Sequence, residues 1–379
     1  MWIDEVNARG GLNVGGEKYL VDLYTYDDEA IASKALMGAR ELVLEHDVKF
    51  VNTIGGACTD ACAPFFEERG VIYAPLVSAD SLPTRPLCLV AEANSKGDPC
   101  RARYLKEAHP EIKTVAIVSQ DDPIARITNA FEIGGWEVMG VDVVYESYYS
   151  LDTVDFAPIV SAMMVCNPDV LSWGASYPTF DSALDEQAWH QGFEGYITSN
   201  YMDVETTLSR VPAEWLEARD TTDGYPELDD PWWGVPSKQR DFVDEWYRRF
   251  GPGAPGDVGY KLCSIDWDHV VTTEPWGYAA ECAGTFDAHE VIKAIKNPAN
   301  WPLPTILGDA VMWGEPQFGI DNQIQPHIFI NHIEVHDGEG YRRVVAEYDD
   351  YVEWYTANEA TFRKAAMDRS VFWTQRMEE

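Results

Sequence analysis

Val48–Leu82, with the sequence VKFVNTIGGACTDACAPFFEERGVIYAPLVSADSL, is the stretch that decides the fold. Its apolar, β-branched run Val48–Ile54 predicts a strand that ends at two glycines. A short helix is expected over Ala63–Arg69, and a second strand over Val71–Val77. Two strands joined by so short a helix run parallel, so the turns that follow them meet at the carboxyl edge of one sheet.

The two turns at this edge, residues 56–60 and 78–81, contain hydroxyls, a thiol and backbone N–H groups. Neither turn contains an evident catalytic base. Open α/β sheets bind small molecules at such edges. The combination indicates a protein that holds a ligand rather than an enzyme that transforms one.

Composition narrows the class of protein further. A chain of 379 residues is long enough for two domains with separate cores. The net charge of −36 argues against a nucleic-acid partner, because phosphates are neutralised by clusters of Lys and Arg. No apolar run approaches the roughly 18 residues of a membrane span. The first residues also lack the basic and apolar segments of a signal peptide.

Strand and helix patterns alternate along both halves of the chain. The first half has a further predicted strand over Tyr19–Tyr24, and the second half begins a new alternation at Thr114. Alternation of this kind predicts a parallel sheet covered by helices, and two runs of it predict two α/β lobes. The predicted strands of the second half cover Thr114–Val118, Val138–Tyr145, Val170–Trp173 and Tyr196–Thr198.

Several short segments resemble the type I periplasmic binding proteins of the branched-chain amino acid and amide group, which supply ligands to ABC importers. Residues 3–11 resemble the family's first helix with its Asn-x-x-Gly-Gly end, and Tyr26–Asp28 resembles the acidic turn after its second strand. Further matches are the segment Asp152–Pro158 before a helix, the turn Asn167–Asp169 and the helix end Ala279–Gly284. The order and spacing of these segments also resemble those of the family, and the resemblance covers most of the chain.

The resemblance implies two Rossmann-like α/β lobes, with parallel sheets flanked by helices and joined by a multi-strand hinge. The first ligand-binding lobe would comprise residues 1–110 and 224–312, and the second residues 113–222 and 313–345. A C-terminal helical extension would cover residues 346–379. The family has a strand before its first helix, whereas this chain begins inside that helix. The fold is therefore expected to lack the family's first strand and to contain an open slot with unpaired backbone groups.

The resemblance also implies a function. It predicts a periplasmic or extracellular solute-binding protein that closes two lobes on a small organic ligand: an amino acid, an aromatic carboxylate or an amide. Its partner would be the membrane permease of an ABC transporter, and no cofactor is expected. Two alternatives stay open. One is a ligand-sensing receptor or regulator of the same fold, and the other is an α/β hydrolase with its nucleophile near Cys58.

Candidate binding residues of the first lobe lie in the two turns. Cys58 and Thr59 lead into a helix N-terminus, where unpaired N–H groups favour a carboxylate, and they match family positions that hold one. The alternative is that Thr59 only caps the helix. Val77, Ser78 and Ala79 match a family segment that binds through backbone atoms and a hydroxyl, the alternative being an ordinary polar turn.

The second lobe contributes two further pairs of candidates. Ser176 and Tyr177 follow a predicted strand, and Tyr177 matches a family aromatic that closes over the ligand; packing within the lobe is the alternative. Asn200 and Tyr201 follow the next predicted strand, where amino-acid binders of the family usually carry a carboxylate. Asn200 in that place argues against an α-amino acid ligand, although Asp203 lies three residues on.

The remaining metal-binding and redox signals are weak. The seven cysteines form no C-x-x-C motif, which argues against a structural zinc site. Cys88 and Cys100 flank a polar loop and are candidates for a disulfide in an oxidising compartment. His332, Glu334 and His336 alternate on a predicted strand, where a solvated face is expected rather than a metal site.

Overall fold

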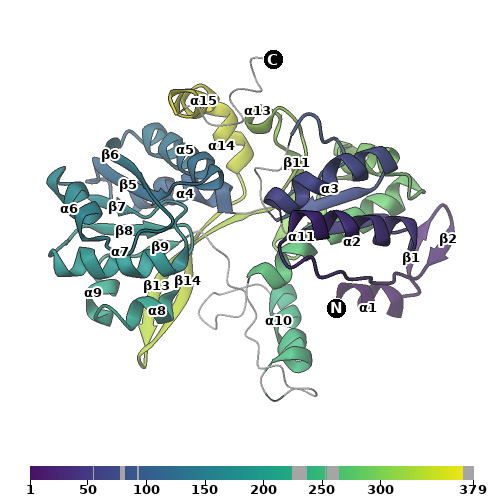
Figure 1. The fold of residues 1–379 in the computed structure, drawn as a ribbon, viewed down its shortest axis with the longest axis horizontal. Helices are drawn as coiled ribbons and strands as arrows, with labels where there is room; N and C mark the ends of the chain where they lie inside the picture. Colours follow the sequence, from purple (N-terminus) through teal and green to yellow (C-terminus); the bar gives the residue numbers. More distant parts are fainter. Residues whose placement is uncertain are drawn as a thin grey trace. The chain divides into compact units, whose positions relative to one another are not determined.

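The computed structural model describes residues 1–53, 55–76, 82–91, 94–223, 237–251, 253 and 264–369. The chain forms two compact units (Figure 1). Unit 1 comprises Met1–Glu92 and Ser237–His327, and unit 2 comprises Ala93–Pro236 and Ile328–Glu379. The described residues 346–369 lie in unit 2.

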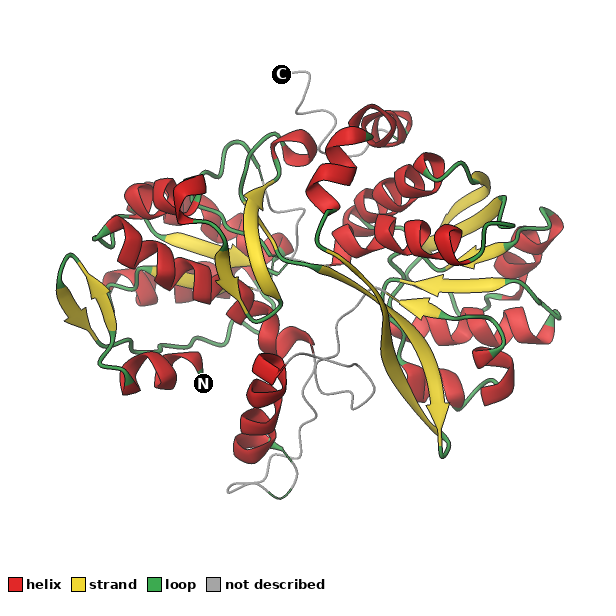
Figure 2. Cartoon of the chain, turned by 180° about the vertical axis from the view of Figure 1, so that it is seen from behind, coloured by secondary structure: helices red, strands yellow, loops and turns green. Residues whose placement is uncertain are grey.

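Unit 1 consists of short strands and the helices around them (Figure 2). Its elements are α1 (Trp2–Ala8), β1 (Leu12–Val14), β2 (Glu17–Tyr19), α2 (Ala32–Leu44), β3 (Phe50–Thr53), α3 (Gly56–Arg69), β4 (Ile72–Pro75), α10 (Ser237–Phe250), α11 (Ser264–Ala283), α12 (Ala288–Ile295), η2 (Pro298–Asn300), β10 (Leu303–Thr305), β11 (Gly308–Trp313), α13 (Glu315–Phe318) and β12 (Gln323–Gln325).

The predicted parallel strand pair of unit 1 is confirmed. β3 pairs with β4 in parallel register, with Phe50 opposite Ile72. Single bridges from Tyr73 to Cys88 and from Val90 to Gln323 connect this pair to the antiparallel strands β12, β11 and β10. Among the described residues, β3 has no strand on its other edge.

The strand predicted over Tyr19–Tyr24 is not formed. β2 ends at Tyr19 and pairs only with β1, and residues 20–28 continue as an irregular segment. The sequence pattern of a strand is not sufficient by itself, because a strand is stabilised by hydrogen bonds to a neighbour. Within the described chain, this segment has no neighbouring strand with which to pair.

Unit 2 is a seven-stranded sheet in the order β14-β13-β9-β8-β7-β5-β6, covered by helices. β6, β5, β7, β8 and β9 run parallel, and the hairpin of β13 and β14 adds antiparallel strands to β9. Its elements are α4 (Asn94–Ala108), β5 (Thr114–Gln120), α5 (Pro123–Val138), β6 (Asp142–Tyr149), α6 (Ala157–Val165), β7 (Val170–Ser172), α7 (Pro178–His190), β8 (Tyr196–Ser199), α8 (Val204–Leu208), α9 (Ala213–Glu217), β9 (Thr222–Asp223), β13 (Ile328–His336), β14 (Glu339–Tyr348), α14 (Tyr351–Ala357) and α15 (Glu359–Asp368).

The core of unit 2 follows from the two-residue period of the central strand β5. Ala116 and Val118 face a core built with α6, α7, α8 and α9, whereas Val115 and Ile117 face α4, α5 and α15. Both faces of the sheet are therefore covered, as expected for parallel strands (Figure 1). No helix in the described part of the chain is long and apolar enough to cross a membrane.

The two C-terminal helices pack onto this body. Phe362 of α15 is fully buried and stacks on Tyr355 of α14, with ring centroids 4.4 Å apart. A bidentate ion pair joins Arg103 of α4 to Asp350, with nitrogen–oxygen distances of 2.8 and 3.0 Å. Three described aromatic residues of these helices, Tyr351, Tyr355 and Phe362, thus belong to the core of unit 2.

Candidate ligand-binding site

In unit 1, the turn after β3 is formed by glycine. Gly55 has a φ of 103° and directly precedes α3, so the chain reverses at the carboxyl end of the strand. The predicted candidate Thr59 is fully buried, and its hydroxyl lies 2.7 Å from the hydroxyl of Thr53 in β3. Thr59 therefore ties α3 to the strand, and its side chain is not presented to solvent.

Cys58, the second candidate in this turn, lines a cavity of about 240 Å³ together with Asp28, Cys62 and His269. Burial raises the pKa of the Cys58 thiol, and the neighbouring Asp28 carboxylate raises it further. Burial also raises the pKa of Cys62, to about 11, and lowers the pKa of His269. The cavity therefore contains protonated thiols and a neutral imidazole at neutral pH.

The remaining residues around this turn are Asp60, Arg85 and the segment after β4. Asp60 forms an ion pair with Arg85, so its charge is compensated at the surface. Val77, Ser78 and Ala79, the other candidates of the first lobe, lie outside the described residues.

In unit 2, the candidates gather around the residues that follow β7. We call Gly174–Tyr177 the tyrosine turn. Ser176 is buried, accepts a hydrogen bond from the Tyr149 hydroxyl (2.7 Å) and donates one to the Val118 carbonyl (3.5 Å). Both contacts lie inside unit 2, so Ser176 fixes the turn rather than offering a free hydroxyl.

Tyr177 is the exposed member of the tyrosine turn, with 48% of its surface accessible. Its backbone N–H donates to Oε1 of Gln120 at 3.2 Å, and its hydroxyl donates to Oδ2 of Asp122 at 3.4 Å. Gln120 in turn donates to both Asp122 (3.0 Å) and the Ala175 carbonyl (2.9 Å). The Tyr177 ring is thus held at the carboxyl edge of β5 and β7, beside Phe180, and remains about half exposed.

Asn200 lies next to the tyrosine turn, because its N–H donates to the Gly174 carbonyl at 3.0 Å. Its side-chain Oδ1 is buried without a hydrogen-bond partner. Tyr201 lies instead against Arg342 of β14, whose guanidinium carbon is 4.9 Å from the ring centroid. The structure therefore brings Ser176, Tyr177 and Asn200 together, whereas the ring of Tyr201 packs on β14.

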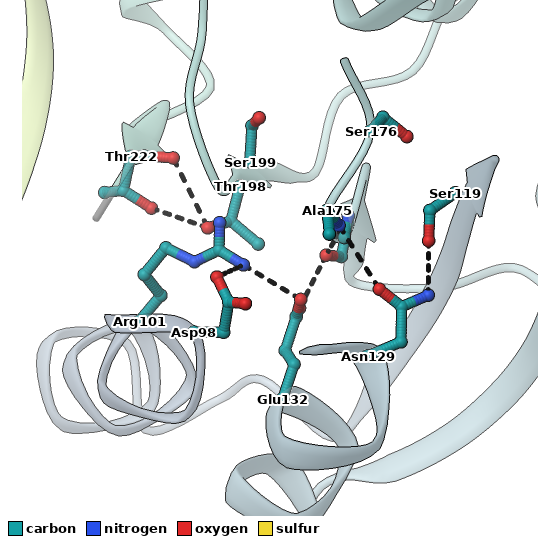
Figure 3. Close-up of polar contacts among 12 residues, drawn as sticks. Asp98, Arg101, Ser119, Asn129, Glu132, Ala175, Ser176, Thr198, Ser199 and Thr222 are labelled. Atoms are coloured by element: carbon teal, nitrogen blue, oxygen red, sulfur yellow. Dashed lines mark hydrogen bonds and ion pairs between the residues drawn. The ribbon is translucent and has the colours of Figure 1, made fainter. Parts of the chain in front are cut away.

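A buried polar network holds the tyrosine turn from below (Figure 3). Asn129 of α5 donates to Ser119 (2.5 Å) and accepts from the Ala175 N–H (3.2 Å). Glu132, one turn along the same helix, accepts from Ser172 (2.5 Å), whose hydroxyl accepts from the Gly174 N–H (3.0 Å). The turn is thus fixed through two of its backbone N–H groups.

The charge of Glu132 is balanced within the same network. Arg101 of α4 lies 2.9 Å from Glu132 and 2.8 Å from Asp98, and all three side chains are fully buried (Figure 3). Trp136 also donates to Glu132 at 3.0 Å. The ion pair with Arg101 and the hydrogen bonds from Ser172 and Trp136 thus fix the position of Glu132, which holds the tyrosine turn through Ser172.

Two buried carboxyl groups on α7 support the neighbouring strand ends. Asp181 accepts a hydrogen bond from Ser199, the last residue of β8, and Asp185 accepts one from Trp173 Nε1 at 2.8 Å. Burial raises the pKa of Asp181 well above its usual range and that of Asp185 to about 7. Both groups are therefore protonated in mildly acidic solution.

Sequence reasoning missed Gln120 and Asp122 as site residues. The sequence signal was present, since both follow the predicted strand Thr114–Val118 in the same way that Ser176 follows its own strand. The predicted disulfide between Cys88 and Cys100 is wrong, because Cys100 is a buried free thiol. Cys88 belongs to unit 1 and Cys100 to unit 2. No cluster of metal-ligating side chains occurs among the described residues.

Comparison with known proteins identifies the family to which this chain belongs. The family model described as periplasmic binding protein matches residues 1–330, so the chain belongs to the periplasmic binding protein family. Members of this family are solute-binding proteins, as the sequence resemblance predicted. No curated protein matches the chain.

Solved structures agree with this fold. An ABC transporter substrate-binding protein from Sphaerobacter thermophilus has a TM-score of 0.73 at 15% identity, over 92% of each chain. A solute-binding protein from R. palustris, in complex with 4-hydroxybenzoate, has a TM-score of 0.68 at 17% identity, over 93% of this chain and 92% of that one. A leucine-binding protein from Thermotoga maritima has a TM-score of 0.66 at 18% identity, over 91% of both chains.

Proposed function

We propose that this protein captures a small organic ligand with a carboxylate or amide end and delivers it to the permease of an ABC importer. Units 1 and 2 would serve as the two lobes that close on the ligand. This role places the protein outside the cytoplasm, in the periplasm or at the cell surface. The titles of two structural relatives, which name 4-hydroxybenzoate and leucine, suggest aromatic carboxylates and amino acids as first candidates.

The observation that carries the proposal is the tyrosine turn. A buried network fixes its backbone, yet the Tyr177 ring is left 48% exposed at the carboxyl edge of a parallel sheet. A rigid, exposed aromatic ring loses little conformational entropy when it contacts a ligand. Cys58 and the start of α3 supply the corresponding edge of unit 1, where helix N–H groups favour a carboxylate.

Asp122 would contact the other end of the ligand. Its carboxylate lies beside the Tyr177 hydroxyl and accepts from Gln120, so a hydrogen-bond donor on the ligand would find acceptors here. Asn200 replaces the carboxylate that amino-acid binders usually carry after this strand. A phenolic hydroxyl or an amide N–H suits such a polar edge as well as an ammonium group does.

The experiment is isothermal titration with 4-hydroxybenzoate and with leucine. Replacing Tyr177 by Ala should weaken binding of the recognised compound at least tenfold. The control is Tyr19→Ala, because Tyr19 is 41% exposed and lies on the separate β1–β2 hairpin. Equal affinities of wild type and Tyr177→Ala would exclude the tyrosine turn from the site.

The chemistry of Cys58 separates binding from catalysis. A nucleophilic cysteine needs a lowered pKa, whereas burial and Asp28 raise the pKa of this thiol. His269 lines the same cavity, but its Nε2 lies 3.4 Å from the Thr53 carbonyl. We therefore expect Cys58→Ser to keep ligand affinity within about threefold, with no turnover by either protein. Turnover of an ester or amide that Cys58→Ser abolishes would instead support the hydrolase alternative.

A further inference from the structure

The first turn of α7 contains a buried carboxyl group that joins two of the candidate turns of unit 2. Asp181 is fully buried, and its N–H donates to the Tyr177 carbonyl at 3.1 Å. Its Oδ2 accepts a hydrogen bond from the hydroxyl of Ser199, the last residue of β8. The next residue, Asn200, donates its N–H to the Gly174 carbonyl at 3.0 Å. Asp181 therefore connects the tyrosine turn to the end of β8, through its backbone on one side and its side chain on the other.

The two oxygens of the Asp181 carboxyl group differ in their surroundings. The Ser199 hydroxyl bonds Oδ2, whereas Oδ1 is buried and has no hydrogen-bond partner in the described part of the chain. A carboxylate anion in a protein interior needs several donors or a cation to replace the water that it loses. The neutral acid needs less compensation, so this environment suits protonated Asp181 better than its anion.

The charged groups that face Asp181 come from three elements. Burial holds the pKa of Asp181 well above its usual range, and the carboxyl groups of Asp185 on α7 and Asp223 on β9 raise it further. The Ser199 hydroxyl and the Arg101 guanidinium of α4 act in the opposite direction. Arg101, however, already pairs with two other buried carboxyl groups (Figure 3). The native structure therefore holds a proton on Asp181 under conditions in which an exposed aspartate is ionised.

Loss of this proton to solvent water would leave a negative charge between α7 and β8. The anion is hydrated only where water reaches it, so ionisation favours separation of α7 from β8 at Asp181. Tyr149 of β6 lies beside the same carboxyl group: burial raises the pKa of its phenol, and Asp181 raises it further. The Tyr149 hydroxyl donates to Ser176 at 2.7 Å, so the charge would also act on a residue that fixes the tyrosine turn.

We propose that Asp181 is a proton-controlled latch of the tyrosine turn. With the proton in place, Asp181 and Ser199 hold the start of α7 against the end of β8, and the turn keeps the described geometry. When the proton leaves as the pH rises, the two elements separate at this contact and the turn is released. Ligand affinity would then be higher in mildly acidic than in alkaline solution, a consequence that rests on the proposed function.

The test is amide hydrogen exchange of the full chain, followed by NMR without any ligand, so that it does not depend on the proposed function. The reporters are the N–H groups of Asn200 and Tyr177, which bond the Gly174 carbonyl and the Gln120 side chain. Their protection factors, which correct for the intrinsic exchange rate, should fall at least tenfold between about pH 6 and about pH 9. Equal protection at both pH values would overturn the proposal.

The amide of Ile117 separates local release from unfolding of the whole unit. Ile117 is fully buried in the central strand β5, between β6 and β7. At about pH 9 its amide should remain at least tenfold more protected than that of Asn200, because the latch opens without loss of the sheet. Equal protection of the two amides at this pH would contradict a local latch.

A matched pair of variants assigns the proton. Asp181→Asn keeps the shape of the neutral acid but cannot ionise, so the fall in Asn200 protection should shrink to less than threefold. Asp185→Asn removes the other buried carboxyl group of α7 and should leave the tenfold fall in place. A fall that persists in Asp181→Asn, or that disappears in Asp185→Asn, would overturn the assignment to Asp181. Should Asp181→Asn fail to fold, wild type and Asp185→Asn still decide.

Removal of the Ser199 hydroxyl tests the contact itself. Ser199→Ala deletes the donor to Asp181 and should lower the protection of Asn200 at about pH 6 at least fivefold. The control is Ser209→Ala, because Ser209 is exposed and its hydroxyl donates to the Thr206 carbonyl on α8 at 2.7 Å. Equal protection of Asn200 in the two variants would contradict a latch made by Asp181 and Ser199.

Discussion

Replacement of Gly174 by alanine tests whether the tyrosine turn is held as described. Gly174 has a φ of 54°, and a Cβ added there would lie 2.4 Å from Oδ1 of Asn129. The left-handed conformation costs an alanine about 1–2 kcal/mol. Relief of the contact requires Asn129 to move, which breaks its hydrogen bond to the Ala175 N–H and leaves a buried donor unsatisfied, at about 1–3 kcal/mol. The free energy of unfolding should therefore fall by about 2–5 kcal/mol.

Gly140 provides the matched control. Its φ is 69°, and a Cβ added there would meet no atom within 4 Å. Gly140→Ala should thus cost only the conformational share, about 1–2 kcal/mol. The assay is urea denaturation followed by tryptophan fluorescence, and the quantity of interest is the difference between the two variants.

A double-mutant cycle identifies the contact. In Asn129→Ala/Gly174→Ala the close oxygen is absent, so the combined loss should be smaller than the sum of the single losses by about 1–3 kcal/mol. Two results would refute the reasoning: a difference between Gly174→Ala and Gly140→Ala below about 0.5 kcal/mol, or additive losses in the double variant.

Three further predictions concern the stability of unit 2. Burial raises the pKa of Asp185 from 3.8 to about 7, so the native state loses stability as the pH rises through this range. The free energy of unfolding of Asp185→Asn should therefore increase relative to that of wild type between pH 4 and pH 8. Urea titrations that give the same difference at every pH would contradict this prediction. Phe362→Ala should lower the unfolding free energy by about 3–5 kcal/mol, because Phe362 is buried. Met367→Ala, at an exposed position of α15, should lower it by less than about 0.5 kcal/mol. Equal melting temperatures of the two variants would contradict the packing of α15. Arg103→Lys should lose about 1–3 kcal/mol because lysine cannot form the bidentate pair with Asp350; denaturation midpoints equal to wild type would argue against that pair.

Strands and edge turns could be predicted from the sequence where local composition decides them. The β-branched runs before Ile54 and after Thr114 became β3 and β5, and the polar residues after them lie at the carboxyl edges. The turn at Asp337 and Gly338, where both residues have positive φ, joins β13 to β14, and an Asp–Gly pair favours such a hairpin turn.

Features that depend on distant partners could not be predicted in the same way. Ser176 is buried because Tyr149, 27 residues away in sequence, donates to it. The sequence of α4 is polar and contains Pro99, yet Arg101 is buried there by its ion pairs with Asp98 and Glu132. Local patterns identify which residues are polar, whereas the fold decides which of them point inward.

The central claim, capture of a small organic ligand, is tested most directly by thermal unfolding of the full chain against a ligand panel. The panel comprises amino acids, aromatic carboxylates, amides and quaternary ammonium compounds, each at concentrations up to the millimolar range. A true ligand at about 100 times its dissociation constant should add roughly 2.7 kcal/mol to the unfolding free energy. We predict a clear rise in melting temperature with one class that carries a carboxylate or amide. Cooperative unfolding at the same temperature with every compound would contradict the account.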